Sequence, residues 1–386
     1  MPLAVFVLGL SVFALGTSEF MITGLLPGMA ADLHVSIPDA GLLISAFAIG
    51  MVVGAPLLAI GTLRLPRRRT LLALLVVFVA AHVVGALAGS YAVLFATRVV
   101  AAFACAGFWA VALATTIALV PAARRGRAMA VLVGGLTVAN IAGVPAGTFL
   151  GQHAGWRTAF WAVAVVTVVA VAGVALLVPE TTGGAVSVRG ELRLYRRGRV
   201  WLALGVIALA QAMIFAAFSY LAPLLTETDG LSEGWVPGVL ALFGVGALIG
   251  ISVGGRLADR RPFATLYGFL ALALAALLVL ALTTDAVVAV GAVLVFGVAG
   301  FGVNPALNLR AYQVAGDAPT LVGASTTAAF NVGNTAGPWL GGVAIGAGLG
   351  FPSVAWTGIA LGVATLAALT VAAAVQRGDD REPALV

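Results

Sequence analysis

Apolar residues dominate the chain in long runs that short polar segments separate. Twelve of these runs are each long enough to cross about 30 Å of hydrocarbon as a helix. Glycine is frequent, with 49 residues, as is typical of membrane helices that pack through small side chains. The pattern predicts an all-α polytopic membrane protein. Its twelve spans are expected at residues 3–26, 38–61, 70–89, 91–113, 128–151, 157–178, 200–225, 235–256, 262–283, 285–308, 320–344 and 352–375.

The composition supports this prediction and excludes several classes of protein. The 386 residues are 62% hydrophobic and 9% charged, whereas soluble domains carry about a quarter charged residues. Because the chain is this apolar, its net charge of +6 does not indicate nucleic-acid binding. All of its basic residues are arginines. One cysteine, Cys105, and three histidines without ligand spacing predict no disulfide and no metal site. No phosphate-binding loop or nucleophile–base cluster is visible, so we expect neither an ATP-driven pump nor an enzyme.

The arginines predict the orientation in the membrane. With an even number of spans, they gather in alternate loops, whereas acidic residues gather in the opposite loops. Because positive loops stay on the cytoplasmic side, both termini are expected to be cytoplasmic. The loops expected inside hold Arg64, Arg67, Arg68, Arg69, Arg124, Arg125, Arg127, Arg189, Arg193, Arg196, Arg197, Arg199, Arg256, Arg260, Arg261 and Arg310. The acids expected outside are Asp32, Asp39, Glu227, Asp229, Glu233 and Asp285.

The two halves of the chain are similar in pattern. Gly50 and Gly54 in the second span match Gly246 and Gly250 in the eighth, and other matches share similar offsets in the same order. Such internal repeats are typical of transporters built from two related bundles. We therefore predict two pseudo-symmetric six-helix bundles. The expected boundaries are 1–178 for the first bundle, 179–199 for a cytoplasmic linker, 200–375 for the second bundle and 376–386 for a cytoplasmic tail.

Two charged residues lie inside predicted spans. Glu19 lies in the first span and Arg98 in the fourth, each about seven residues from the outer end, so their depths are similar. A charge at membrane depth is costly, so it is rare and usually functional. The two residues predict a proton-coupling site, in which Glu19 takes up and releases a proton beside Arg98. The alternatives are a static ion pair that fixes helix register, and substrate contact without proton transfer.

Polar and aromatic residues in other spans are candidates for substrate binding. An apolar cleft with a few polar groups suits an amphipathic ligand. The alternatives are interhelical hydrogen bonds for the amides and ordinary core packing for the aromatic rings. The candidates are Trp109, Asn140, Gln211, Phe215, Phe218, Tyr220, Asn331 and Asn334.

Two further stretches are candidates for gating. Gly143, Pro145 and Gly147 bend the fifth span or let it pack tightly against a neighbour. In the loop after the eighth span, Arg256, Asp259 and Arg260 could lock two helices together through Asp–Arg pairs. The alternative is that these arginines only determine topology.

These motifs resemble the major facilitator superfamily over essentially the whole chain. Residues 255–260 (GRLADR) resemble its loop motif, Arg98 its fourth-span arginine, and 143–147 (GVPAG) its antiporter motif. In the first-half copy of the loop motif, Leu65 stands where an Asp is expected. Residues 16–21 (GTSEFM), 45–51 (SAFAIGM) and 155–161 (GWRTAFW) are similar to actinobacterial chloramphenicol exporters, a branch related to arabinose and sugar-efflux transporters.

The resemblance implies a twelve-span drug:proton antiporter of the bacterial inner membrane that works by alternating access. It implies the proton as coupling ion, no cofactor, a small amphipathic drug such as chloramphenicol as substrate, and function as a monomer. It adds Met21, which closes the first motif, to the candidate substrate-binding residues. Asn304, Asn308 and Asn334 are closer to the sugar-efflux side, so sugar or nucleoside export stays an alternative, as does proton-coupled import.

Overall fold

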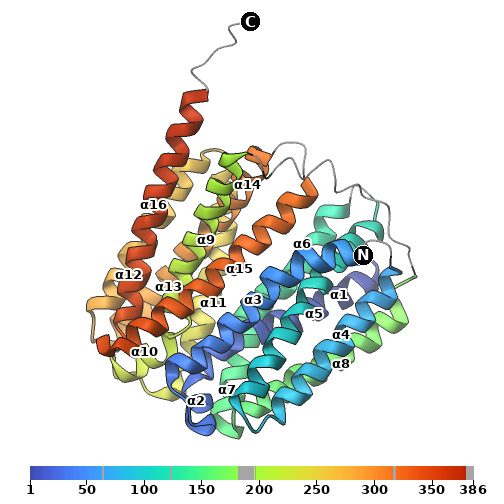
Figure 1. Cartoon of the computed structure of the whole chain (residues 1–386), viewed down its shortest axis with the longest axis horizontal. Coiled ribbons are helices and arrows are strands. Elements are labelled where there is room, and N and C mark those ends of the chain that lie inside the picture. The colour runs from blue at the N-terminus through green and yellow to red at the C-terminus, as the bar shows by residue number, and fades with distance from the viewer. Residues whose placement is uncertain (63–64, 122–123, 181–194, 196, 316–318, 380–386) are drawn as a thin grey trace, which may run out of the picture.

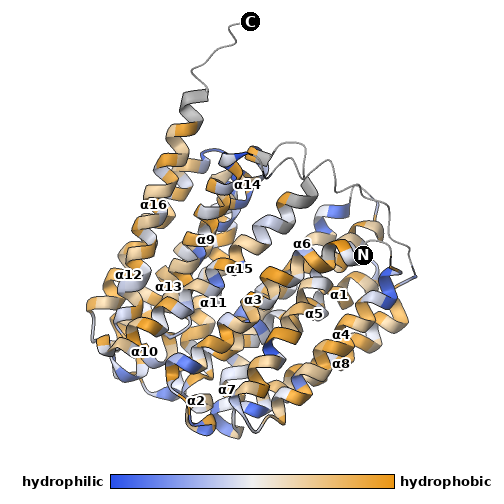
Figure 2. Cartoon of the chain, viewed as in Figure 1, coloured by the Kyte–Doolittle hydropathy of each residue, from blue (hydrophilic) through white to orange (hydrophobic). Residues whose placement is uncertain are grey.

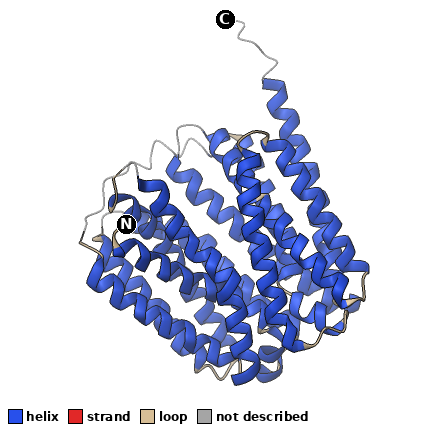
Figure 3. Ribbon diagram, turned by 180° about the vertical axis from the view of Figure 1, so that it is seen from behind, coloured by secondary structure: helices blue, strands red, loops and turns tan. Residues whose placement is uncertain are grey.

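The computed structural model of the chain is built from helices joined by short loops (Figure 3). It describes residues 1–62, 65–121, 124–180, 195, 197–315 and 319–379. The long connection predicted at 179–199 therefore lies mostly outside the described residues. Two groups of helices lie side by side in Figure 1, one from each half of the sequence.

The first group comes from residues before the connection. It comprises α1 (Leu3–Phe20), η1 (Met21–Gly24), α2 (Leu26–Leu33), α3 (Ile37–Gly61), α4 (Arg67–Ala86), α5 (Tyr91–Ala118), α6 (Arg125–Val138), η3 (Ala139–Gly143), α7 (Val144–Ala154) and α8 (Trp156–Leu177). Here η1 is a 3₁₀ turn and η3 is a π-helical segment.

The second group follows the connection. It comprises α9 (Gly198–Phe218), α10 (Leu221–Glu227), η5 (Glu233–Trp235), α11 (Val236–Ala258), α12 (Pro262–Leu282), α13 (Ala286–Gly302), α14 (Asn304–Ala315), α15 (Pro319–Ala344), η6 (Ile345–Leu349) and α16 (Ser353–Asp379).

The spans predicted from hydropathy are present as helices. Eleven helices of the described chain are long and apolar enough to cross a membrane, and the remaining predicted span, 320–344, coincides with α15. Hydrophobic residues run along the helices, while most hydrophilic segments lie at their two ends (Figure 2). Large apolar side chains such as Leu176, Val169 and Val287 are exposed on the outer surface, which suits contact with lipid rather than water.

Several spans differ from the prediction because their helices are broken or longer. The first span leaves α-helical geometry after Phe20, tightens into η1 and continues as α2. The seventh span is likewise divided after Phe218 and the tenth at Val303. Hydropathy cannot predict these breaks, because a membrane helix and its broken continuation are equally apolar. A 3₁₀ or π segment within a helix often marks a functional site.

The ends of the helices carry opposite charges. We call the arginine-rich end the one where α1, α4, α6, α9 and α12 begin, and the acidic end the one where α3, α5, α8 and α13 begin. The described arginines at the first include Arg67, Arg68, Arg69, Arg125, Arg127, Arg260 and Arg261. The second carries Asp32, Asp39, Glu227, Asp229, Glu233 and Asp285.

The two groups of helices meet along α3 with α15, and along η3 and α7 with α11. The Ser45 hydroxyl on α3 donates to the Thr335 carbonyl on α15, 3.0 Å away. On the other seam, a Cβ placed on Gly244 would lie 2.6 Å from the Asn140 carbonyl oxygen, so only glycine allows this approach. The turn η1, which directly follows α1, also contacts α10 and α11 of the second half.

Candidate functional site

Glu19 lies in the last turn of α1, one residue before the helix ends. Its side chain is half-buried. Within the described residues, no hydrogen bond or ion pair reaches its carboxylate. The α-helix gives way to the 3₁₀ turn η1 directly beyond it, at Met21. The structure thus places an unpaired carboxylate next to a change in helical geometry.

Arg98 lies on α5 beside this turn and is 1% exposed. Its two terminal nitrogens donate to Ser18, Nη1 to the hydroxyl at 2.9 Å and Nη2 to the main-chain oxygen at 2.9 Å. The guanidinium also lies over the ring of Phe47 on α3, 4.4 Å from its centre. A buried cation is stabilised by such hydrogen bonds and by the face of an aromatic ring.

His82 on α4 continues this network. Its Nδ1 lies 2.8 Å from the Phe78 carbonyl oxygen and its Nε2 lies 2.7 Å from the Ser18 hydroxyl. A carbonyl oxygen only accepts, so Nδ1 carries a proton. A second cation beside buried Arg98 would be costly, so the ring is neutral and Nε2 accepts from Ser18. The Ser18 oxygen is then left to accept from Arg98.

The network determines how the two predicted coupling residues lie. Arg98 and Glu19 are close enough to interact electrostatically. No Arg98 nitrogen is within 4.0 Å of a Glu19 oxygen, and the Nε of Arg98 has no hydrogen-bond partner in the described part of the chain. The static ion pair considered as an alternative is therefore not formed in this arrangement.

Aromatic rings connect Glu19's surroundings to the second half. Phe20 of α1 lies 5.7 Å from Phe215 of α9, ring centre to ring centre. Phe218 is 5.6 Å from Phe215 and stacks on Phe243 of α11 at 4.4 Å. Phe215 thus contacts the first half through Phe20, whereas Phe218 packs against rings of its own half. All four rings are buried, so they pack against one another in this arrangement.

Other predicted substrate residues are spread over both halves. Met21 is buried and lies against Gly147 of α7, while Trp109 of α5 is half-buried against the core. Gln211 of α9 packs with its Cβ against Gly333 of α15. The Gln211 side-chain oxygen is buried and has no partner among the described residues.

The predicted asparagines bond mainly within their own helices. Asn140 Nδ2 donates to the Leu136 oxygen and Asn331 Nδ2 to the Thr327 oxygen, each at 3.0 Å. Asn334 Nδ2 is 3.5 Å from Asn331 Oδ1, and its own Oδ1 is buried without a partner, as far as the described residues show. An unpartnered acceptor in an apolar helix is costly unless water or a ligand donates to it.

Tyr220 lies where the halves close against each other at the acidic end. It is fully buried, and its hydroxyl donates to the Pro338 oxygen on α15 at 2.9 Å. A Cβ on Gly41 of α3 would lie 2.2 Å from this hydroxyl, and one on Gly342 would lie 2.6 Å from it. The side chain predicted to bind substrate therefore belongs to a tight contact between α3, α10 and α15 in this arrangement.

The glycines of the antiporter-like stretch pack against the first span. A Cβ on Gly143 would lie 2.0 Å from the Thr17 Oγ1, and one on Gly147 would lie 3.3 Å from the Met21 Cβ. Pro145 falls in the first turn of α7, directly after the π-helical η3. These contacts agree with tight packing, one of the two interpretations of the stretch. They place a helix irregularity opposite the segment that holds Glu19.

Among the described residues, the charged loop after α11 makes no Asp–Arg lock in this arrangement. Arg256 lies in the last turn of α11, and Asp259 follows it as the C-cap. Neither Asp259 nor Arg260 takes part in an ion pair within 4.0 Å with any described residue. The described chain also contains no group of three or more His, Cys, Asp or Glu side chains that could hold a metal ion.

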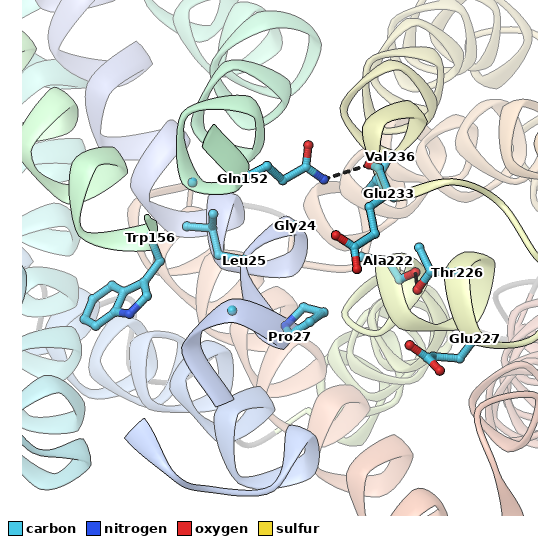
Figure 4. A pocket seen from close by; sticks show the side chains of 12 residues that line it. Gly24, Leu25, Pro27, Gln152, Trp156, Ala222, Thr226, Glu227, Glu233 and Val236 are labelled. Atoms are coloured by element: carbon cyan, nitrogen blue, oxygen red, sulfur yellow. Dashed lines mark hydrogen bonds between the residues drawn. The ribbon is translucent and has the colours of Figure 1, made fainter. Parts of the chain in front are cut away.

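A cavity of about 340 Å³ lies between residues of the two halves at the acidic end. Its lining includes Gln152 of α7 and Thr226 and Glu227 of α10 (Figure 4). The Gln152 amide donates to the Glu233 main-chain oxygen at 2.8 Å, a bond drawn in Figure 4 that joins the two halves. This cavity was not predicted from the sequence, because its residues come from helix ends that lie far apart in the chain.

Two carboxylates at the acidic end, Asp32 of α2 and Asp229 after α10, have unusual surroundings. Hydrogen bonds from Arg157 and Trp156 hold the pKa of Asp32 below its usual value and connect α2 to α8. Asp229 is 4% exposed, and neither oxygen has a partner among the described residues. Burial raises the pKa of the Asp229 carboxyl to about 6.

Sequence reasoning missed Ser18 and His82. His82 offers no ligand spacing, and Ser18 is an ordinary small residue in a membrane helix. The available signal was that both are polar residues in predicted apolar spans, where side chains need partners. Which partner each one finds depends on how the three helices are rotated against one another.

Comparisons with known proteins identify the family. The profile of the Major Facilitator Superfamily matches residues 8–331. The chain is 46% identical over 376 residues to a chloramphenicol resistance protein from Streptomyces lividans, covering 95% of this chain and 96% of that protein. It is 37% identical over 362 residues to the inner membrane transport protein YdhP of Escherichia coli K12, covering 93% of each.

A solved structure shares the fold. A bacterial homologue of the human lysosomal transporter Spinster superposes with a TM-score of 0.75 at 19% identity, covering 96% of this chain and 95% of that one. The family and its fold are those of membrane transporters rather than enzymes, and the relatives and apolar helices indicate a multi-pass protein of the bacterial inner membrane. The chain belongs to the major facilitator superfamily.

Proposed function

We propose that the chain exports small amphipathic drugs, chloramphenicol first among them, in exchange for protons. The observation that carries the proposal is Glu19, a half-buried carboxylate inside a span that lies beside Arg98 and forms no ion pair with any described residue. The 46% identical chloramphenicol resistance protein of Streptomyces lividans supports the choice of substrate. No cofactor is needed, because the proton is the coupling ion.

The coupling rests on the surroundings of Glu19. Burial favours its protonated form, and approach of Arg98 favours its charged form. A rearrangement that changes the exposure of Glu19 or its distance from Arg98 would therefore make it bind or release a proton. An inward proton uses the membrane potential, worth about 2.3 kcal/mol per charge per 100 mV, as well as the pH gradient.

The orientation follows from the arginines. We propose that the arginine-rich end and both termini are cytoplasmic, because positively charged loops stay inside. Glu19 then lies in the outer part of the first span, nearer the acidic end. Protons would enter from that side and leave on the cytoplasmic side. The proposed working unit is a monomer of two bundles, 1–178 and 200–375.

The packing supports an arrangement that is closed at the acidic end. A hydrogen bond from Gln152 to Glu233 joins the halves at this end, and one from Ser45 to Thr335 joins them deeper in the spans. At the arginine-rich end, α6 and α14 pack closely only with elements of their own half. Rocking of the halves about this contact would expose Glu19 to either side in turn. The π-helical η3 and Gly143, with Asp259 and its neighbouring arginines, are the proposed gating elements.

The substrate site would combine rings with unpartnered acceptors. Phe215 and Phe218 offer apolar surface, and the Gln211 and Asn334 oxygens are buried without partners in the described chain. A ligand with hydroxyl or amide donors on an apolar body would satisfy these oxygens. Met21, Trp109, Asn140, Tyr220 and Asn331 complete the proposed set.

Chloramphenicol accumulation in a sensitive bacterial host tests the function. Cells that make the chain are expected to accumulate less drug than cells with an empty vector, and a protonophore should remove the difference. Glu19→Gln should also remove it, while Glu227→Gln, an exposed acid at the acidic end, should leave it intact. Accumulation equal to the empty vector, with the protein present in the membrane, contradicts drug export.

A second candidate is export of sugars or nucleosides on the same scaffold. The unpartnered oxygens of Gln211, Asn304 and Asn334 favour it, because ligands rich in hydroxyl groups would supply several donors. Efflux of labelled sugars and nucleosides from loaded vesicles distinguishes the two functions. Efflux of a sugar or nucleoside without any transport of chloramphenicol supports the second candidate. Comparing the rates of uptake and efflux of the same labelled compound tests proton-coupled import.

A further inference from the structure

We propose that His82 and Ser18 are positioning residues that hold Arg98 clear of the Glu19 carboxylate and thereby determine the pH at which Glu19 exchanges its proton. This inference rests on the proposed proton role of Glu19. It assigns a task to two polar residues inside spans that the transport mechanism above does not use.

The hydrogen bonds among His82, Ser18 and Arg98 have defined directions. Arg98 only donates, and so does the Nδ1 proton of His82 towards Phe78. Between them, the Ser18 hydroxyl donates to His82 Nε2 and accepts from Arg98 Nη1. His82 thus keeps the Ser18 hydrogen pointing away from Arg98. The acceptor side of Ser18 stays available to the guanidinium.

These hydrogen bonds restrain the Arg98 guanidinium. Both terminal nitrogens are engaged by Ser18, one through the hydroxyl and one through the main chain. The ring of Phe47 on α3 packs against the guanidinium. Glu19 is the next residue along the helix, yet receives none of these hydrogen bonds. If the contact with the Ser18 hydroxyl is lost, Nη1 of Arg98 is free to turn towards the Glu19 carboxylate.

The position of Arg98 affects proton binding at Glu19. An opposite charge that moves to within a few ångströms of a carboxylate favours its charged form, with typical shifts of one pH unit or more. The titratable or charged described groups that face Glu19 are Arg98 and Cys105 on α5, and His82 on α4 stands behind Ser18. Phe47 on α3 and Phe215 on α9 contribute no charge. Arg98 is therefore the group whose position sets the proton exchange.

Two substitutions at His82 separate its two hydrogen bonds. The amide of glutamine reaches the position of Nε2, so His82→Gln keeps an acceptor for Ser18. The amide of asparagine reaches the position of Nδ1, so His82→Asn keeps the bond to Phe78 and loses the bond to Ser18. Ser18→Ala removes the hydroxyl itself.

The experiment follows protonation of Glu19 directly, by infrared titration of the purified protein in lipid nanodiscs. The band of a protonated carboxyl that is missing in Glu19→Gln belongs to Glu19. We expect His82→Gln to titrate with the wild type. His82→Asn and Ser18→Ala should titrate about one pH unit lower, a tenfold change in proton concentration. The double variant Ser18→Ala/His82→Asn should shift no further than Ser18→Ala, because both changes act through the same contact of Arg98 with the Ser18 hydroxyl.

The outcomes distinguish this inference from the proposed function. If Ser18→Ala and His82→Asn titrate with the wild type, or at higher pH, the positioning role is wrong. A purely structural role would lower thermal stability in the His82 variants without moving the titration. If His82→Asn fails to fold, Ser18→Ala decides the question alone. The proposed function fails separately, if Glu19→Gln still exchanges drug for protons.

Discussion

Arg98 donates to both the hydroxyl and the main-chain oxygen of Ser18, the residue immediately before Glu19. The buried cation thus spends two of its donors on the neighbour of the carboxylate, not on the carboxylate itself. A tight buried ion pair would hold Glu19 permanently charged. An unpaired carboxylate beside a restrained cation is suited to binding and releasing a proton.

Packing between the first and fifth spans depends on Gly143. In Gly143→Ala the new methyl group would overlap the Thr17 Oγ1, so the two helices must move apart. We expect a loss of about 1–3 kcal/mol in the free energy of unfolding. Gly134→Ala is the matched control, because it lies in the same span with nothing within 4 Å of the new atom. Thermal unfolding in detergent measures the stability of both variants. A Gly143→Ala variant as stable as the wild type would contradict this packing.

Closure of the acidic end depends in part on Ser45. Ser45→Ala removes its hydrogen bond to the Thr335 oxygen across the two halves. Loss of this bond should reduce the free-energy difference between the closed and the open arrangement by about 1 kcal/mol. The population that is open at the acidic end then rises by about fivefold. Spin labels on the exposed positions Gly89 and Gly234, changed to cysteine, report the distance between the halves. Cys105 is buried and is not expected to react with the label.

The control for Ser45 is Ser252→Ala, since the exposed Ser252 hydroxyl bonds only within its own helix, to the Leu248 oxygen. It should leave the distance distribution unchanged. If Ser45→Ala leaves the distribution unchanged as well, the hydrogen bond contributes nothing to closure.

Asp229 predicts a pH dependence of stability. Burial raises its pKa to about 6, so the folded state binds its proton more tightly than the unfolded state does. Stability from this residue is therefore present below the ordinary pKa near 4 and is lost as the pH rises through 6. Asp229→Asn should stabilise the protein by about 1–2 kcal/mol at pH 7.5 and have no effect at pH 4.

Thermal unfolding at the two pH values tests this prediction, with the exposed Glu227→Gln as control. The expected result is a gain for Asp229→Asn alone, and at pH 7.5 alone. A loss of stability at pH 7.5 would mean that the charged carboxylate of Asp229 has a favourable partner.

Much of the fold could be predicted because the membrane imposes one length on every span. Even α15, rich in glycine and polar residues, lies where the apolar run 320–344 predicts it. Breaks within spans were not predictable, since the geometry changes after Phe20 and at Val303 without a loss of hydrophobicity.

The candidate site also combines features that the sequence predicts with features that it does not. Glu19 and Arg98 stand out in the sequence because charges are rare in spans. Tyr220 lies in a close contact between three helices, and His82 meets Ser18 from another helix. Both outcomes depend on the rotation and tilt of helices, which no residue pattern within one span determines.

The most direct test of the central claim is proton movement driven by drug in proteoliposomes. A chloramphenicol gradient is imposed across vesicles that contain the purified protein, and a trapped dye reports the internal pH. The account predicts that the wild type moves protons against the direction of drug flow and that Glu19→Gln does not. Equal proton movement in the two proteins, or drug flow without any pH change in the wild type, would contradict it.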